Sequence, residues 1–406
     1  MNFLEIKEIN QYNNIAMIKK ILLTTIILLM TYMPIMAFDY TTRTNLSLDE
    51  SISDQNGTKY AYPEKILVTK IESLDRDITS SPQEWIDAIY YYTITRLGFA
   101  DIPYNFFLDE GGNIYQGRKG YVGVVPEISS ENGTVVIGYL SSRSTLTTRA
   151  SNSLKNMYQD LSSKYGIGKE DVYTAILKLN TGENSLSYVT PQITDDNFST
   201  AVKVAVENAK EYTTENLQYK TKIENITHED TVQVGEKLGI KLTATNLNDF
   251  VWFNTPDNIY VSTSNEEETV FAINGIWDSF SKPTHLSKEY ILPGESIDIE
   301  FSLQANALPG DKEISFNLLK YTEKPFTDSS FDINFKIEKG DKELGEISSP
   351  EGYLNVRKCP GYNCEIITSV ENGQVFIIKD TQDAWKKIEY EDGQEGWVFI
   401  RYIKSL

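Results

Sequence analysis

The chain has 406 residues, 40% of them hydrophobic and 12% aromatic, which is typical of a globular protein with roughly two to four domains. Its formal net charge is −20, so both the phosphate backbone of a nucleic acid and an anionic membrane surface would repel it. The 25 tyrosines favour β-rich structure and surfaces that bind sugars or peptides. The negative net charge therefore argues against a nucleic-acid-binding protein.

The first 37 residues predict an export signal. Residues 17–20 carry two lysines, residues 21–36 are almost wholly apolar, and Ala37 offers a small residue for cleavage. This apolar run is shorter than the roughly 20 residues that span a membrane. We therefore expect a cleaved signal peptide at residues 1–37, with Met17 as an alternative start and an uncleaved anchor as the alternative outcome. The rest of the chain would be secreted or held in the cell envelope.

A polar segment at residues 38–62 predicts a linker, and helix and strand patterns then alternate over residues 63–213. Ser81, Pro82 and Glu84 have the spacing of a helix start with a capping box. The alternation predicts a layered α/β domain, a mixed sheet with flanking helices. Its expected strands are 65–69, 104–108, 113–116, 134–140 and 172–179, and its expected helices begin near 82, 148 and 197.

Helical periodicity is absent from residues 217–339, where short strand-like runs alternate with turns such as Pro293-Gly294, as in a β-sandwich. A charged linker is expected at 340–349 and a small all-β domain at 350–406. Within that last domain, Cys359 and Cys364 flank a Pro-Gly turn, which favours a disulfide in an exported protein. Two free or metal-binding thiols are the alternative.

The most specific motif is LGFADIPYNFFLD at residues 97–109, continued by GNIYQGR at 112–118. It resembles the peptidoglycan recognition proteins and the related zinc-dependent N-acetylmuramoyl-L-alanine amidases, over about 150 residues. The resemblance implies a groove that receives the muramyl stem peptide. It also implies, in members that cut, a Zn²⁺ ion that polarises the scissile amide and activates water.

The zinc ligands of that family are missing. Residues 63–213 contain no histidine and no cysteine, and a hydrolytic zinc site normally needs three protein ligands. The first ligand position of the family falls on Thr69 or Lys70, and the later ones near residues 177–180. We therefore expect a degenerate domain with no metal, no cofactor and no catalytic residue; zinc and a catalytic Tyr104 apply only if the domain is active.

Four residues of this domain are candidates for contact with peptidoglycan: Thr69, Tyr104, Asn105 and Arg118. Tyr104 matches the tyrosine that hydrogen-bonds the zinc-bound water in catalytic relatives, and otherwise fits a groove floor. Arg118 could pair with a carboxylate of the stem peptide because its guanidinium makes two parallel hydrogen bonds, or it could form an ion pair within the domain. Three carboxylates follow no cation-ligand spacing and are expected in turns and on the surface: Asp101, Asp109 and Glu127.

The middle segment resembles immunoglobulin-like domains of bacterial surface proteins, on residues that include Trp252 and Trp277. The last segment resembles the bacterial SH3 domain, because LNVR at 354–357 is followed by GWV at 396–398. That resemblance implies binding to cell-wall peptides, with Trp385, Trp397 and Tyr402 as candidate groove residues.

Together these features predict an exported cell-wall protein that binds peptidoglycan or muramyl peptides without cutting them. Two alternatives stay open. One is an active N-acetylmuramoyl-L-alanine amidase with an unusual site, and the other is an envelope adhesion or assembly protein. Neither nucleic acid nor membrane is expected as a partner, except for the membrane through an uncleaved N-terminal segment.

Overall fold

The computed structural model describes residues 38–54, 58–71, 81–127, 132–141, 143–177, 196–210, 217–320, 324–391 and 393–406, so the predicted signal peptide lies outside it. The chain forms two compact units: the first ends at Leu217, and the second comprises Gln218–Leu406 with Tyr60–Tyr62 and Tyr121–Gly123. In the described part of the chain, no helix combines the length and apolar character that a membrane span needs.

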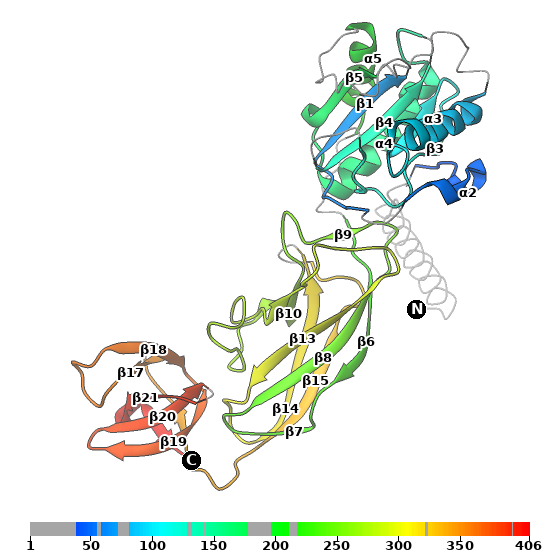
Figure 1. Cartoon of the computed structure of the whole chain (residues 1–406). Helices are drawn as coiled ribbons and strands as arrows, with labels where there is room; N and C mark the ends of the chain where they lie inside the picture. The colour runs from blue at the N-terminus through cyan, green and yellow to red at the C-terminus, as the bar shows by residue number, and fades with distance from the viewer. Residues whose placement is uncertain are drawn as a thin grey trace, which may run out of the picture. The chain divides into compact units, whose positions relative to one another are not determined.

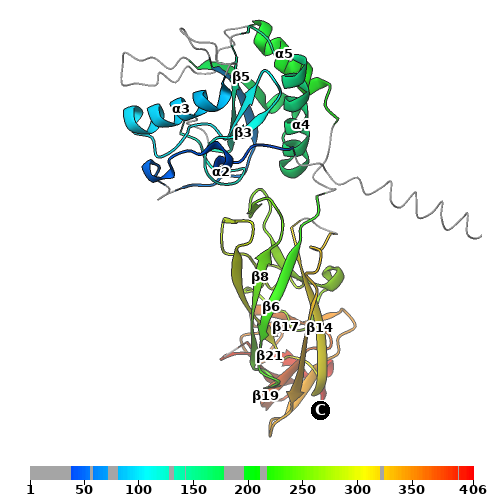
Figure 2. The same cartoon turned by 90° about the vertical axis from the view of Figure 1, so that its right-hand side faces the viewer.

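The first unit is an α/β domain with a five-stranded mixed sheet in the order β3-β2-β4-β1-β5 (Figure 1). Strands β2, β4, β1 and β5 are parallel and β3 is antiparallel to β2. Helix α3 covers one face of the sheet, and α4 and α5 cover the other (Figure 2). The predicted mixed sheet with flanking helices is confirmed. The bounds are β1 Lys65–Ile71, α3 Pro82–Leu97, β2 Phe106–Asp109, β3 Ile114–Gln116, β4 Thr134–Leu140, α4 Thr148–Tyr165, β5 Val172–Leu177 and α5 Asp196–Glu207.

Local sequence determines where the helices end. Helices α3 and α4 stop at Gly98 and Gly166, whose φ angles of 73° and 70° lie in the left-handed region that glycine adopts without strain. Thr147 caps α4 by accepting a hydrogen bond from the Ala150 amide. The capping box predicted at Ser81 was wrong: its side chain makes no capping hydrogen bond, and only Pro82 in the first turn starts α3 as expected.

The first part of the segment expected to be a linker at 38–62, residues 38–54, instead packs against the α/β domain. Thr41 bridges to Tyr115 beside β3, and a short helix α2 (Arg43–Leu46) follows. The Arg43 side chain is buried and pairs with Asp101. Leu48 joins the cluster between α3 and the sheet. Local composition suggested a linker because the partner of Arg43 lies far away in sequence.

The second unit begins with a β-sandwich. One sheet has the order β11-β10-β14-β15-β7, a second has β13-β8-β6, and a two-stranded sheet pairs β12 with β9. The first two sheets meet through the rings of Phe301 and Phe316, whose centroids are 5.2 Å apart. The immunoglobulin-like assignment remains a prediction. The bounds are β6 Thr221–Thr227, β7 Thr231–Gln233, β8 Lys237–Asn246, β9 Trp252–Phe253, β10 Tyr260–Thr263, β11 Thr284–His285, β12 Tyr290–Ile291, β13 Ser296–Gln304, β14 Gly310–Leu319 and β15 Phe331–Glu338.

The C-terminal domain is an antiparallel seven-stranded sheet in the order β18-β17-β21-β20-β19-β16-β22. Strand β16 lies inside the expected linker 340–349 and pairs with both β19 and β22, so this part of the segment belongs to the domain. The predicted disulfide Cys359–Cys364 is present. The bounds are β16 Leu344–Ile347, β17 Tyr353–Arg357, β18 Ile366–Glu371, β19 Val375–Gln382, β20 Trp385–Glu391, β21 Gln394–Phe399 and β22 Ile403–Ser405.

Candidate functional site

The first candidate site lies where β1 runs through the centre of the α/β sheet. Thr69 pairs in register with Gly138 on β4 and with Ala175 on β5, and its side chain is fully buried. Lys70 is buried as well. A threonine hydroxyl and a lysine ammonium are poor zinc ligands compared with imidazole, thiolate or carboxylate. Of the later ligand positions, Leu177 ends β5, and residues 178–180 lie outside the described residues.

Tyr104 is completely enclosed beside Thr69. Its ring packs on that of Phe107 with a centroid distance of 4.9 Å, and its hydroxyl has no hydrogen-bond partner among the described residues. Burial raises the pKa of the Tyr104 phenol far above its usual range, and the neighbouring Thr69 side chain offsets part of this rise. At neutral pH the group is a neutral phenol in the core. It therefore does not form an exposed groove floor.

Asn105 and Arg118 have structural partners. The Asn105 amide donates to the Val124 carbonyl at 2.9 Å and accepts from the Val136 amide at 2.8 Å, so it ties a loop to β4. The buried Arg118 guanidinium lies 3.3 Å from a carboxylate oxygen of Glu127. The ion pair within the domain, weighed as the alternative for Arg118, is thus the contact that the structure contains.

The carboxylates of this domain are also engaged. Asp101 accepts from Arg43, and Asp109 accepts from the Asn113 amide and the Tyr115 hydroxyl, each within 3 Å. The described residues contain no cluster of three or more His, Cys, Asp or Glu side chains that could hold a metal ion. The predicted site residues of the α/β domain therefore lie in its packed interior or take part in its internal hydrogen bonds and ion pairs.

The second candidate site is an aromatic surface on the C-terminal domain, formed by Tyr362, Trp385, Phe399 and Tyr402. The Tyr362 ring lies 5.2 Å from that of Trp385 and 5.3 Å from that of Phe399. Phe399 in turn lies 5.5 Å from Trp385 and 6.0 Å from Tyr402. Tyr362 is 65% exposed, whereas Trp385 is buried beneath it. The structure brings Trp385 and Tyr402 together as members of one cluster.

Trp397 has no ring contact among the described residues with this cluster and is mostly buried. Sequence reasoning missed Tyr362 and Phe399. Tyr362 had a usable signal, because an aromatic residue in a short disulfide-closed loop has little room to be buried. Phe399 follows the Gly396-Trp397-Val398 motif directly and had no comparable signal.

A rigid loop presents Tyr362. The Cys359–Cys364 disulfide closes the loop, and the Arg357 side chain donates to the carbonyls of Tyr362 at 3.0 Å and Cys364 at 2.7 Å. A tyrosine fixed in this way contributes contact area to a ligand at a low cost in conformational entropy. The arrangement suits stacking against a sugar ring or a peptide backbone.

The folds and surfaces define a multidomain protein with an α/β domain, a β-sandwich and a bacterial SH3 domain. Residues 352–404 match the family described as bacterial SH3 domain. The chain is 30% identical over 83 residues to the "Probable endopeptidase p60" of Listeria monocytogenes serovar 1/2a, which covers 20% of this chain and 17% of that protein. Its namesake in Listeria innocua serovar 6a is 34% identical over 67 residues, covering 16% and 14%. The chain thus spans less than a fifth of the length of these relatives.

Similar solved structures include Drosophila PGRP-LB, with 13% identity, a TM-score of 0.31, and coverage of 44% of this chain and 99% of that one. Drosophila peptidoglycan recognition protein SD has 11% identity and a TM-score of 0.31, with coverage of 44% and 98%. The N-acetylmuramoyl-L-alanine amidase LysC from Clostridium intestinale has 18% identity and a TM-score of 0.27, with coverage of 38% and 92%.

Proposed function

We propose that this protein is an exported cell-envelope protein that binds peptidoglycan through its α/β domain and its C-terminal SH3 domain, and that the α/β domain does not hydrolyse it. One observation carries the second half of this proposal. Where the resembling family places its first zinc ligand, this chain has a fully buried threonine, Thr69, next to an enclosed Tyr104 phenol.

The chemistry of this position argues against amide hydrolysis by zinc. A catalytic zinc site needs three deprotonated or neutral donor groups and an open position for water. The Thr69 hydroxyl and the Lys70 ammonium supply neither a strong donor nor an anionic one. The phenol of Tyr104 is held neutral by burial and does not reach a solvent-filled site. Peptide binding without cutting needs none of these groups.

The C-terminal domain supports the binding half of the proposal. Its match to the bacterial SH3 domain and the exposed aromatic surface around Tyr362 fit recognition of a wall peptide or sugar. Two weak binding modules in one chain raise the apparent affinity for a polymer, because the second contact becomes intramolecular. This suits a repetitive ligand such as murein.

The test uses the full chain without residues 1–37. The protein should co-sediment with purified insoluble murein and release no stem peptide, and metal analysis of the same preparation should find no stoichiometric zinc. Release of stem peptide that a chelator or Tyr104→Phe abolishes would instead establish an active amidase. Failure to sediment with murein, together with saturable binding to a defined envelope protein, would establish the adhesion or assembly alternative.

A further inference from the structure

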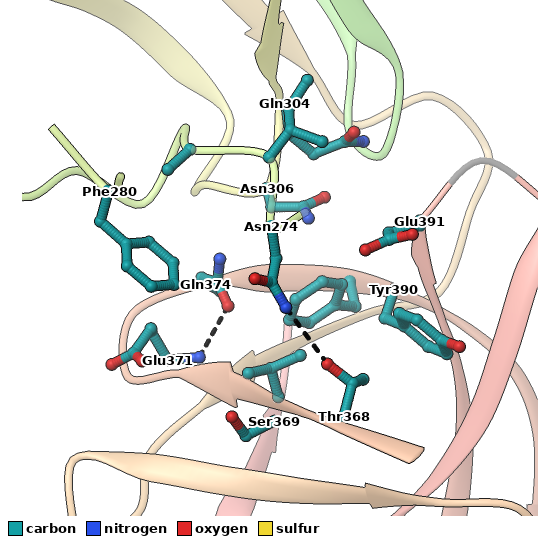
Figure 3. Close-up of a pocket in the computed structure, with 14 residues that line it drawn as sticks. Asn274, Phe280, Gln304, Asn306, Thr368, Ser369, Glu371, Gln374, Tyr390 and Glu391 are labelled. Atoms are coloured by element: carbon teal, nitrogen blue, oxygen red, sulfur yellow. Dashed lines mark hydrogen bonds between the residues drawn. The ribbon is translucent and has the colours of Figure 1, made fainter. Parts of the chain in front are cut away.

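A small cavity lies between the β-sandwich and the C-terminal domain, inside the second unit (Figure 3). Its volume is about 30 Å³, which holds a group the size of a water molecule or an ammonium ion. The sandwich contributes Asn274, Gln304 and Asn306 to its lining, and the C-terminal domain contributes Glu371, Tyr390 and Glu391. It is separate from both candidate sites described above.

Hydrogen bonds between the two domains build this cavity. The Val375 amide donates to the Asn306 carbonyl at 2.8 Å, and the Asn274 side-chain amide donates to the Thr368 hydroxyl at 3.4 Å. Gln374 is also fixed, because its side-chain oxygen accepts from the Glu371 amide at 2.7 Å. The lining residues therefore belong to a joined surface of the two domains.

Two side chains in the lining have amide oxygens that accept no hydrogen bond from the described residues. Gln304 is 2% exposed and Asn306 is 3% exposed, yet the Gln304 Oε1 and Asn306 Oδ1 atoms have no hydrogen-bond partner among the described residues. The Gln304 Nε2 donates to the Gly235 carbonyl at 2.8 Å, which settles which end of this amide is the oxygen. Buried acceptors are nearly always satisfied in folded proteins, so we expect these two to receive a donor that is not among the described residues.

The charge and walls of the cavity define that donor further. Glu391, which is half-exposed, and Glu371, which is exposed to solvent, are the two carboxylates in the lining, and the lining residues include no lysine, arginine or histidine. In Figure 3 the Glu391 side chain points toward that of Asn306. Phe280, Phe376 and Tyr390 form apolar walls around these polar groups. Aromatic walls attract a cation and pack against methylene groups.

We propose that this cavity binds a primary ammonium group at the end of an aliphatic chain, as in the side chain of lysine or another diamino acid. Such a group supplies three N–H donors and a positive charge, and the cavity of about 30 Å³ accommodates the ammonium group alone, with the methylene stem at its mouth. A divalent cation fits less well, since Ca²⁺ takes six to eight oxygen ligands and gains nothing from apolar walls. Water also satisfies the two amide oxygens, but it brings no positive charge to the Glu391 carboxylate in the lining.

The test adds a short peptide to the full chain in increasing amounts. The peptide has blocked ends and contains one lysine. NMR signals of the Gln304 and Asn306 side-chain amides should shift and saturate. The same peptide with an acetylated lysine should leave these signals unchanged, because acetylation removes the charge and two of the three donors. Equal shifts from both peptides, no saturable shift, or shifts produced by CaCl₂ but not by the lysine peptide would each overturn the proposal.

Variants separate this site from general charge effects. Glu391→Gln keeps the shape of a half-exposed side chain. It should weaken binding of the lysine peptide about tenfold, because one charge-assisted hydrogen bond is lost. Glu351→Gln removes an exposed carboxylate of the same domain that does not line the cavity, and should leave the affinity unchanged. Equal affinities of the two variants would contradict the site. Murein co-sedimentation is scored separately, so that the proposed function and this site can fail independently.

Discussion

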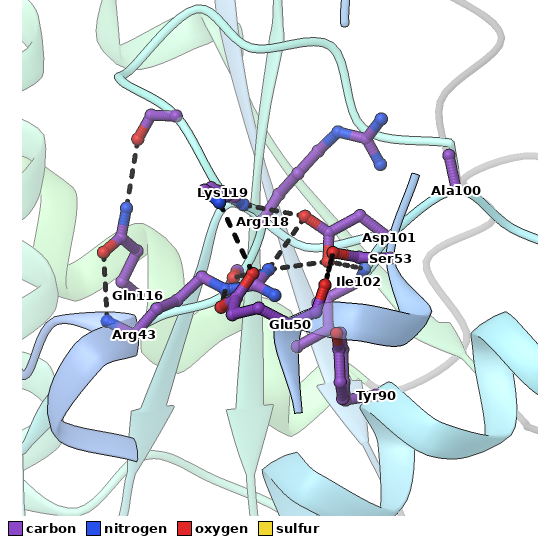
Figure 4. A network of polar contacts seen from close by, with 12 residues as sticks. Arg43, Glu50, Ser53, Tyr90, Ala100, Asp101, Ile102, Gln116, Arg118 and Lys119 are labelled. Carbon is purple, nitrogen blue, oxygen red and sulfur yellow. Dashed lines mark hydrogen bonds and ion pairs between the residues drawn. The ribbon is translucent and has the colours of Figure 1, made fainter. Parts of the chain in front are cut away.

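The Arg43 guanidinium and the Asp101 carboxylate form a buried ion pair, with Nη1 2.6 and 2.8 Å from the two carboxylate oxygens (Figure 4). The same nitrogen donates to the Gly117 carbonyl at 3.0 Å, and the Arg43 Nε donates to Glu50 at 2.8 Å. These contacts hold a segment of polar composition against the loop between α3 and β2 and against Gly117, which follows β3. The α/β domain therefore begins well before residue 63.

Replacement of Arg43 by methionine should lower the free energy of unfolding of the α/β domain by about 3–5 kcal/mol, because it leaves the Asp101 carboxylate buried without its cation. Chemical denaturation followed by circular dichroism measures the change. Arg143→Ala is the control: Arg143 pairs with Glu110 but is 63% exposed, so its removal should cost less than about 1 kcal/mol. Equal losses in the two variants would show that the buried pair contributes no more than a surface one.

Gly138→Ala should destabilise the α/β domain by about 1–3 kcal/mol through overpacking. A Cβ atom at this position would lie 2.7 Å from Ile71 Cδ1, 2.9 Å from Phe107 Cδ1 and 3.0 Å from Tyr104 Cδ1. Gly239 on β8 is the matched control, since a Cβ there meets nothing within 4 Å. Thermal unfolding should show a lower transition temperature for Gly138→Ala and an unchanged transition temperature for Gly239→Ala. An unchanged transition in Gly138→Ala would mean that the core around Tyr104 is loosely packed.

Tyr362→Ala should weaken murein binding about tenfold or more, because it removes the most exposed ring of the aromatic surface. Its fold should be unaffected, since the side chain projects from a loop that the disulfide and Arg357 hold in place. Binding isotherms with insoluble murein measure the effect. Tyr353→Ala removes another exposed tyrosine of the same domain and should bind as the unaltered protein does. Similar losses in both variants would indicate a diffuse surface.

Lys320 should make the second unit more stable as the pH rises above neutrality. The side chain is 3% exposed, and its ammonium donates to the carbonyls of Phe253 and Thr255. Burial lowers the pKa of Lys320 to about 8, and Asp257 opposes this shift. The unfolded chain keeps a lysine pKa of about 10.4, so between about pH 8 and pH 10 it binds more protons than the folded protein.

The free energy of unfolding should therefore rise across this window, by at most about 1.4 kcal/mol per pH unit. Urea denaturation at several pH values measures the slope. The rise should disappear in Lys320→Met and persist in Lys237→Met, which removes an exposed lysine of the same sandwich. A slope that survives in Lys320→Met would assign the pH dependence to other groups.

The sequence predicted elements well where local signals and tertiary packing agree. Helix α4 begins at residue 148 and strand β4 spans 134–140, as expected, because a threonine cap and a continuous apolar run are local features. The Ser81 capping box failed, since spacing alone does not fix where the serine side chain points. The packed segment around Arg43 was missed because its contacts are long-range.

The sequence also predicted only part of the candidate sites. The resemblance gave Thr69 or Lys70 a ligand position and matched Tyr104 to a tyrosine near the zinc-bound water, but it could not show that these side chains are buried. Trp385 and Tyr402 do lie in one aromatic cluster, whereas Trp397 does not contact it. The unpaired oxygens of Gln304 and Asn306 depend on how two domains meet, which no local pattern reports.

Strand β16 has a practical consequence for anyone who isolates the C-terminal domain. The family match begins at residue 352, yet β22 pairs with β16, which lies between β22 and β19 in the sheet. A fragment that starts at the match would lack β16. The edges of β19 and β22 that pair with β16 would then be open to intermolecular pairing. Expression from residue 340 or earlier keeps the sheet whole and should yield monomers where the shorter fragment aggregates.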